Sequence, residues 1–338
     1  MPRFSTHLVI ALLSERKGLQ RVELDSGRRA YVLTELIGTV AVGDRVVVNT
    51  TAVDLDLGSG GWDVVHWNLA REDWSQEGPG QVMKLRYTSL QADTGADEEG
   101  NGYQPGHRLD AMPVVACSLH SQVACVAAAF KHAAPNRRLA YVMTDGGSLP
   151  LALSDVVAGL SACGLLDTTI TAGQAFGGEH EAVNVLSALH VAKVGAGADA
   201  VVVGTGPGVV GTGTKYGTSA LEVAWVIDLA GSGGGRPVLA LRYSEADPRR
   251  RHQGVSHHSL TALEQAHERA LVPVPRLAQA PHAPAHEIVE VEVPDVARLL
   301  SARGLHVTSM GRGPDEDPMF YAYAGAAGIA AASISSPP

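Results

Sequence analysis

The 338-residue sequence predicts an α/β protein in two parts: a small N-terminal β-barrel of the OB or SH3-like kind, then a Rossmann-like, mostly parallel α/β sandwich. The first third holds short β-branched runs and keeps no helical period over ten residues. From Pro113 onward, apolar runs alternate with longer amphipathic segments, as in a parallel sheet covered on both faces. Between these two regions of different sequence pattern, residues 92–108 are acidic and glycine-rich, which indicates a linker or exposed loop. We therefore expect domains at 1–105 and 106–338.

The N-terminal domain is expected to contain five or six short strands, of which five are marked by turn residues between them. They are THLVIALLSER (6–16), LQRVELDSG (19–27), RRAYVLTEL (28–36), GDRVVVNTTAVDL (43–55) and WDVVHWNL (62–69). Asp25–Ser26–Gly27 is a candidate hairpin turn. Such barrels can bind oligonucleotides, but acidic side chains outnumber basic ones over residues 1–110. A structural role, or an interface between copies in a homo-oligomer, is favoured.

The second domain is expected to alternate strands with helices. The strands are MPVVACSL (112–119), RLAYVMTD (138–145), LDTTITAG (166–173), ADAVVVGTG (198–206), RPVLALRYS (236–244), EIVEVEV (287–293) and HVTSMGRG (306–313). The helices are residues 121–133, 151–164, 179–196, 218–231, 296–304 and 319–332. Residues 277–286, rich in Pro, Ala and His, are expected to form a flexible loop, and Gly304 a helix C-cap.

Charge and composition exclude several classes. A formal net charge of −9 argues against a nucleic-acid partner, and the basic run 249–251 beside Glu245 and Asp247 indicates a solvated loop. The apolar run LVIALL is too short to cross a membrane, which predicts a protein without a membrane partner. Three cysteines form neither a disulfide framework nor a CxxC pair, so we expect a reducing, cytoplasmic setting.

Polar clusters follow the predicted strands, and these strand ends meet at one edge of a parallel sheet, where ligands bind. They are His120–Ser121, residues 145–148, 173–180, 206–217 and 311–317. Polar, glycine-bearing loops are also common without any function, which is the alternative explanation.

The segment DAVVVGTGPGVVGTGTKYG (199–217) contains the spacing G-x-G-x-x-G at Gly206, Gly208 and Gly211. A dinucleotide site is disfavoured because the next helix starts only near Ser219. The acidic residue expected about 20 positions on would be Asp228, inside a helical pattern. A Walker A loop is excluded by the absence of Gly-Lys-Ser/Thr.

A broader anion-binding role survives for this segment. Backbone N–H groups, threonine hydroxyls and a lysine before a helix can bind phosphate or carboxylate. The candidate ligand-binding residues are Gly206, Gly208, Gly211, Thr212, Gly213, Thr214, Lys215 and, from the last strand end, Arg312. The alternative is that these residues only make turns.

Candidate acid–base groups are Asp145, Glu179, His180 and His120. Glu179 and His180 are expected near a helix start, where a carboxylate also stabilises the helix dipole, and Asp145 could equally form a turn. No cofactor is indicated. His120, His180, His252, His257 and His258 are candidate metal ligands, but surface or core positions are favoured and no metal site is predicted: HExxH and HxH are absent, and the adjacent His257 and His258 should point apart.

Several loops resemble those of an uncharacterised bacterial protein family, a domain of unknown function. They are LHSQV, GGSLPLALSD, GQAFGGEHEAVN, GPGVVGTGTKYGTS, SHHSLTAL and MGRGPDEDPMF, and the likeness spans most of the chain. The resemblance implies no activity and no catalytic residue. The sequence thus favours a protein that binds a small anionic molecule, either an enzyme using acid–base chemistry or a non-catalytic ligand sensor or scaffold.

Overall fold

The computed structural model describes residues 1–80, 82–100 and 108–334. The chain divides into two compact units, residues 1–95 and 96–338. The boundary predicted at 105/106 falls in the segment 101–107, outside the described residues. The units are described separately below.

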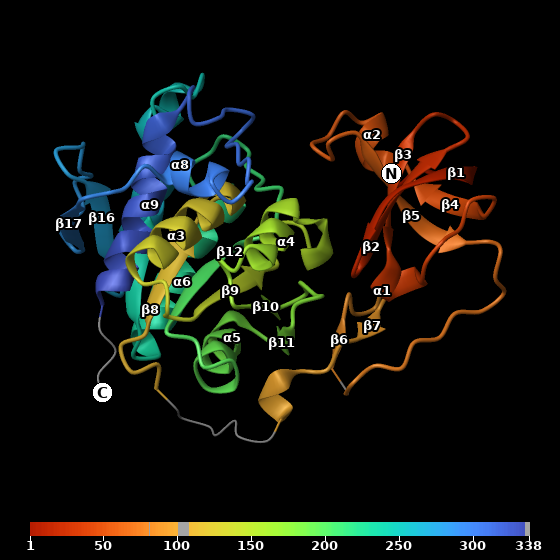
Figure 1. Cartoon of the computed structure of the whole chain (residues 1–338), viewed down its shortest axis with the longest axis horizontal. Helices are drawn as coiled ribbons and strands as arrows, with labels where there is room; N and C mark the ends of the chain where they lie inside the picture. The colour runs from red at the N-terminus through yellow and green to blue at the C-terminus, as the bar shows by residue number, and fades with distance from the viewer. Residues whose placement is uncertain (81, 101–107, 335–338) are drawn as a thin grey trace. The chain divides into compact units, whose positions relative to one another are not determined.

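Residues 1–95 contain a closed five-stranded barrel, which confirms the predicted N-terminal fold (Figure 1). Its strands are β1 (Phe4–Arg16), β2 (Leu19–Leu24), β3 (Arg29–Leu33), β4 (Arg45–Asn49) and β5 (Trp62–Asn68), in the order β1-β2-β3-β5-β4. Pairing of β1 with β4 closes the barrel. Alternate side chains such as Val22, Val32 and Val48 fill its core, as the period of two in a strand requires.

Local turn chemistry sets the barrel's register. Asp25–Gly27 joins the antiparallel pair β2 and β3, with Gly27 at φ +76° and its N–H donating to Leu24 O at 2.8 Å. Two predicted strands are shorter than expected, because their ends form the short helices α1 (Thr34–Ile37) and α2 (Thr51–Asp54). The unit also contains the hairpin of β6 (Met83–Lys84) and β7 (Ala92–Asp93).

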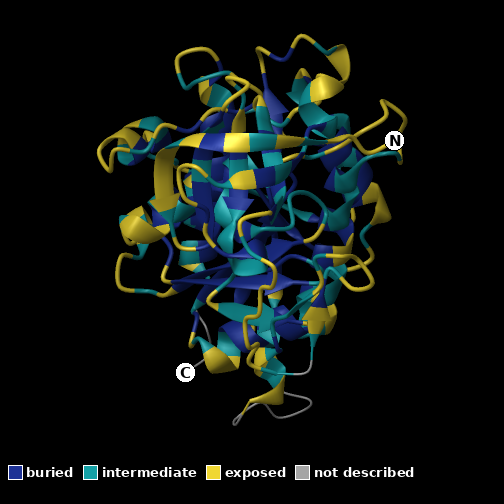
Figure 2. Cartoon of the chain, turned by 90° about the vertical axis from the view of Figure 1, so that its right-hand side faces the viewer, coloured by how far each residue is buried: buried dark blue, intermediate teal, exposed yellow. Residues whose placement is uncertain are grey.

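Residues 96–338 are built on an eight-stranded parallel sheet, which confirms the predicted Rossmann-like α/β fold. Its strands are β8 (Pro113–Cys117), β9 (Leu139–Thr144), β10 (Thr168–Ala172), β11 (His180–Ala182), β12 (Ala200–Thr205), β13 (Arg236–Ala240), β16 (Leu271–Pro275) and β17 (Glu287–Val291). Their order is β11-β10-β9-β12-β8-β13-β16-β17. The inner strands β8, β9, β12 and β16 are mostly apolar and are buried along their whole length, in the buried interior that Figure 2 shows.

Helices cover both faces of this sheet and produce two hydrophobic clusters. One face carries α3 (His120–Ala133), α4 (Asp155–Ala162), α8 (Val296–Ser301) and α9 (Pro318–Ser333). The other carries α5 (Val185–His190), which continues as the π-helical turn η3 (Val191–Gly195), together with α6 (Glu222–Ser232) and α7 (His257–Gln265). No helix among the described residues is long and apolar enough to span a membrane.

Strand order places a switch point in the middle of the sheet. β12 lies between β8 and β9, yet its following helix α6 packs on the face opposite to α3 and α4. The loops that leave the carboxyl ends of β12 and β8 therefore run to opposite faces of the sheet. Such divergence leaves a crevice where α/β sheets bind ligands.

Two predicted elements are wrong. The segment 306–313 is no strand: Met310 (φ +52°) and Gly311 (φ +81°) turn the chain, and Ser309 and Arg312 bond each other's backbone. The helix expected from residue 179 begins only at Val185, capped by Asn184. His180–Ala182 instead form β11, the edge strand paired with β10.

Candidate functional site

A cluster of charged side chains lies just past the carboxyl end of β13. The chain leaves β13, forms β14 (Tyr243–Ser244), makes the short turn η5 (Arg250–His252), returns through β15 (Gly254–Val255) and enters α7. β14 and β15 pair as a two-stranded ladder that holds this excursion together. The excursion places Asp247 in the interior, fully buried.

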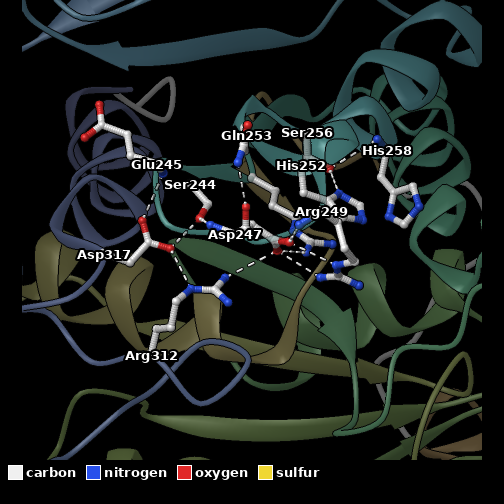
Figure 3. Close-up of polar contacts among 11 residues, drawn as sticks. Ser244, Glu245, Asp247, Arg249, His252, Gln253, Ser256, His258, Arg312 and Asp317 are labelled. Atoms are coloured by element: carbon white, nitrogen blue, oxygen red, sulfur yellow. Dashed lines mark hydrogen bonds and ion pairs between the residues drawn. The ribbon is translucent and has the colours of Figure 1, made fainter.

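Three arginines share the carboxylate of Asp247 (Figure 3). Arg249 is bidentate, with Nη2 at 2.8 Å from Oδ2 and Nε at 2.9 Å from Oδ1. Arg242 Nη2 and Arg312 Nη2 each lie 3.3 Å from Oδ2. We call Arg242, Arg249 and Arg312, with the carboxylates Asp247 and Asp317, the arginine cluster.

Asp317 connects this cluster to α9. It occupies the N-cap position of α9, but its side chain makes no cap hydrogen bond. Its carboxylate instead accepts from Ser244 Oγ at 2.5 Å, from the Glu245 N–H at 3.2 Å and from Arg312 Nε at 3.3 Å. Arg312, a predicted ligand residue, is thereby held between two buried carboxylates.

The electrostatics of the cluster are dominated by positive charge. Burial alone would raise the pKa of Asp247, but hydrogen bonds from Arg249 hold it well below its usual range. Burial lowers the pKa of Arg242 to about 10, and the positive charge of Arg249 adds to that fall. At neutral pH three guanidinium groups therefore face two carboxylates, while the Glu245 side chain points away toward Tyr243 (Figure 3).

Three histidines stand beside the arginine cluster. His252 ends η5, and His257 and His258 begin α7, whose N-cap is Ser256. One ring nitrogen from each lies within 4.8 Å of the other two. Burial lowers the pKa of His252 to about 3 and that of His258 to about 4, with the neighbouring positive charges acting in the same direction. All three rings are thus neutral at pH 7.

A small cavity lies at the switch point, between the carboxyl ends of β8, β9 and β12. Its lining includes Thr144, Thr205 and Glu222, the first residue of α6. The Thr144 hydroxyl lies close enough to the Glu222 carboxyl to lower its pKa slightly, against the effect of burial. Burial raises the pKa of Glu222 to about 7, and the negative charge of Asp145 adds to the rise. Glu222 can therefore exchange a proton at neutral pH.

Two of the predicted acid–base residues lie near this switch point. Asp145 follows β9, is exposed, and accepts from the Gln174 N–H at 3.0 Å, so it joins the loop after β9 to the loop after β10. His120 opens α3, with Nε2 2.7 Å from Ser154 Oγ and Nδ1 3.0 Å from Thr205 O. Burial lowers the pKa of His120, which leaves it a neutral connector between loops.

The other two predicted acid–base residues, Glu179 and His180, lie away from the switch point. Glu179 precedes the edge strand β11 and accepts from Thr168 Oγ1 at 2.7 Å, at the amino end of β10. His180 Nδ1 lies 2.8 Å from Asp97 Oδ1. The structure does not bring these two residues to the carboxyl edge, because the expected helix is a strand.

The first glycines of residues 206–217 allow a close approach of two backbones. A Cβ on Gly206 would lie against Ser148 O, and one on Gly147 against Gly206 O. The Ser148 N–H donates to Pro207 O at 2.8 Å in the same contact. Gly206 and Gly147 therefore have a packing role.

The later part of the segment is a closed turn. The Thr212 N–H donates to Gly217 O at 2.7 Å, and Thr212 Oγ1 and Thr214 Oγ1 lie 2.9 Å apart. Lys215 pairs with Glu264 of α7 at 2.5 Å. Gly208 and Gly213 have positive φ, and Gly211 bridges to Thr218. Much of the expected anion nest is thus engaged in its own turn, although the Arg251 guanidinium lies near Gly213.

Sequence reasoning missed several residues of the site. The run 249–251 is not simply solvated, because Arg249 binds the buried Asp247. The signal was Ser-Glu-Ala-Asp-Pro directly after the β13 strand pattern, a carboxyl-end loop like the others. Glu222 carried the weaker signal of an acid at a helix start. Asp228 binds the backbone N–H groups of His267 and Glu268, which excludes the ribose role.

Fold and site together define a two-unit protein with a small β-barrel and a Rossmann-like α/β unit that carries a charged cluster at the carboxyl edge of its sheet. The chain belongs to the DUF3866 family: the family model, described as a protein of unknown function, matches residues 29–328. This match confirms the resemblance seen in the loops. A search of curated proteins found none that matches the chain.

Proposed function

We propose that this protein binds a small anionic ligand, bearing a phosphate or carboxylate group, at the arginine cluster. The observation that carries the proposal is the sharing of one buried carboxylate, Asp247, by three guanidinium groups. Asp317 neutralises part of the positive charge that Asp247 leaves uncompensated. The remaining positive charge lies beyond the carboxyl end of a central strand, where α/β sheets bind ligands.

The state of Arg242 supports the same conclusion. Burial, together with the positive charges of Arg249 and Arg312, lowers the pKa of Arg242 to about 10, a fall that Asp247 offsets only in part. An anion beside Arg242, Arg249 and Arg312 would supply the missing negative charge. Planar guanidinium groups bind phosphate and carboxylate through paired N–H donors, which suits this ligand class.

Calorimetric titration of the full chain with inorganic phosphate, at constant ionic strength, tests the proposal. Arg312→Gln should weaken phosphate binding roughly 10- to 100-fold, because a charge-assisted hydrogen bond is lost. The matched control is Arg276→Gln, an exposed arginine paired with Glu292 on the β16–β17 side of the sheet. Equal affinity in wild type and Arg312→Gln, or no phosphate binding, would contradict the proposal.

An enzymatic role is favoured by one further observation, the cavity residue Glu222 with its pKa of about 7. ³¹P NMR of the protein incubated with a panel of phosphorylated metabolites separates the two candidates. Product formation that Glu222→Gln abolishes, with phosphate binding retained, supports an enzyme. Binding without product across the panel supports a non-catalytic sensor.

We also propose that the barrel is an interface between copies of this chain. The strand β1 exposes a row of large apolar side chains: Phe4, Leu8, Ile10, Leu12 and Leu13. Contiguous apolar surface of this kind is uncommon on monomeric proteins. A second copy presenting the same strand would cover it.

A further inference from the structure

We propose that His252, His257 and His258 bind one divalent transition-metal ion of the zinc class. The proposal concerns the histidines alone and does not depend on the anion site. It differs from the expectation drawn from sequence spacing, since adjacent histidines usually diverge. Here the third ligand, His252, comes from the turn η5 and lies against both (Figure 3 shows His252 and His258).

The geometry brings the three rings to one point. Ring centroids lie 5.0 Å apart for His252–His257, 4.8 Å for His252–His258 and 4.2 Å for His257–His258. The candidate ligand nitrogens lie within 4.8 Å of one another. Tetrahedral zinc with Zn–N near 2.0–2.1 Å holds its nitrogens about 3.3 Å apart. Small rotations of the rings are therefore enough to close the site.

Each ring also has a nitrogen without a hydrogen-bond partner. These atoms are His252 Nε2, His257 Nε2 and His258 Nδ1; all are inaccessible to solvent and unpartnered among the described residues. His252 and His258 are themselves more than nine-tenths buried. An unsatisfied buried polar atom costs about 1–3 kcal/mol. A single metal ion would satisfy all three nitrogens, which explains why they gather here.

The second contact of His252 is the one that metal-bound imidazoles usually make. Its Nδ1 lies 2.8 Å from Ser256 Oγ, which also accepts the His258 N–H at 3.3 Å as the N-cap of α7. Donation from Nδ1 to the hydroxyl leaves the Nε2 lone pair directed at the other rings. Such a partner fixes both the tautomer and the orientation of a ligand histidine.

Charge around the histidines sets the character of the site. Neutral imidazoles are the form that binds metal, and His252 and His258 are buried. The nearby Arg242, Arg249 and Arg251 oppose a cation, and the first two of them pair with Asp247. Three nitrogens leave a fourth position open, as in catalytic zinc sites. An anion in that position would reduce the remaining repulsion.

Cobalt binding by the full chain tests the site. After EDTA treatment and dialysis, the wild type should take up one Co²⁺ per chain, with the intense visible absorption of tetrahedral Co²⁺. His257→Gln, the least buried of the three, should lower the affinity at least about tenfold, since one of three ligands is lost. The matched control His267→Gln, at an exposed histidine bound to Asp228, should bind as wild type does.

X-ray absorption at the zinc edge, on zinc-loaded wild type, provides a measurement that needs no variant. Three imidazole ligands are expected. Fewer than three, no uptake of metal, or Co²⁺ affinity unchanged by His257→Gln would overturn the proposal. The three nitrogens would then be satisfied by trapped water.

Discussion

At the scale of single residues, the cavity carboxyl Glu222 links the switch point to pH. Its side chain sits over the backbone of Gly146, where a Cβ would collide with Oε2. The loop after β9 therefore needs glycine to admit this carboxyl. Burial disfavours the charged carboxylate, which raises the pKa of Glu222 from 4.5 to about 7.

This shift predicts how stability depends on pH. Between pH 4.5 and pH 7 the folded protein keeps a proton that the unfolded chain releases, so Glu222 destabilises the fold increasingly as pH rises. The cost is absent below pH 4.5 and complete above pH 7, at roughly 3–4 kcal/mol. The free energy of unfolding of Glu222→Gln, relative to that of wild type, should therefore increase by that amount when the pH is raised from about 4.5 to about 8.

Urea unfolding of wild type and of Glu222→Gln, at about pH 4.5 and at about pH 8, measures this gain in stability. The exposed Glu264→Gln, which removes the partner of Lys215, is the control and should show no such rise across the window. A stability difference between wild type and Glu222→Gln that stays constant with pH would refute the assignment. The contributions of the other titrating groups cancel in this difference, because wild type and Glu222→Gln both carry those groups.

At the scale of elements, the packing of α9 on α3 depends on small residues. A Cβ on Gly328 would collide with the backbone of α3 at Val126 and Phe130, so the helices approach backbone to backbone. Gly328→Ala should cost roughly 2 kcal/mol, as overpacking of a rigid contact does. Chemical unfolding of the full chain measures the loss.

Gly195→Ala in η3 is the matched control. There the added Cβ makes only an ordinary contact with Val191 Cγ1 at 3.7 Å, and alanine favours a helix over glycine by about 0.5–1 kcal/mol. We expect this variant to be as stable as wild type or more so. Equal losses in the two variants would show that backbone contact is not the cause.

Elements with a strong pattern could be predicted from sequence, and those decided by tertiary contacts could not. The strand over residues 200–205 and the helix over 121–133 follow from apolar continuity and period. The failure at residues 306–313 came from an αL residue, Met310, which no pattern marks. Arg312 stands out in the sequence because it lies among loop glycines, whereas its pairing with Asp247, 65 residues away, depends on the tertiary fold.

At the scale of the whole molecule, each unit has a hydrophobic core of its own. The barrel core contains residues between Val9 and Leu90, and the two clusters of the α/β unit start at Leu109. The apolar row on β1 lies outside the barrel core and is the surface proposed to join copies.

Light scattering coupled to size exclusion tests that association. We expect the wild type to elute with the mass of a dimer or larger oligomer, and Ile10→Glu to shift it toward the monomer, because a buried unpaired charge is costly. Val42→Glu, at an exposed apolar residue of the barrel outside β1, should leave the mass unchanged. A monomeric wild type would end the proposal.

The strand order also has a consequence for biosynthesis. β8 is the first strand of the sheet to be made, but its neighbours are β12 and β13, so it has no strand to pair with until residue 200 and beyond have been synthesised. β9 and β10, made soon after, can pair with each other at once. The nascent chain thus holds an apolar five-residue strand, Pro113–Cys117, that only α3 can shield for the time it takes to make some eighty more residues. Protection of this segment on the ribosome is a demand that the topology itself creates.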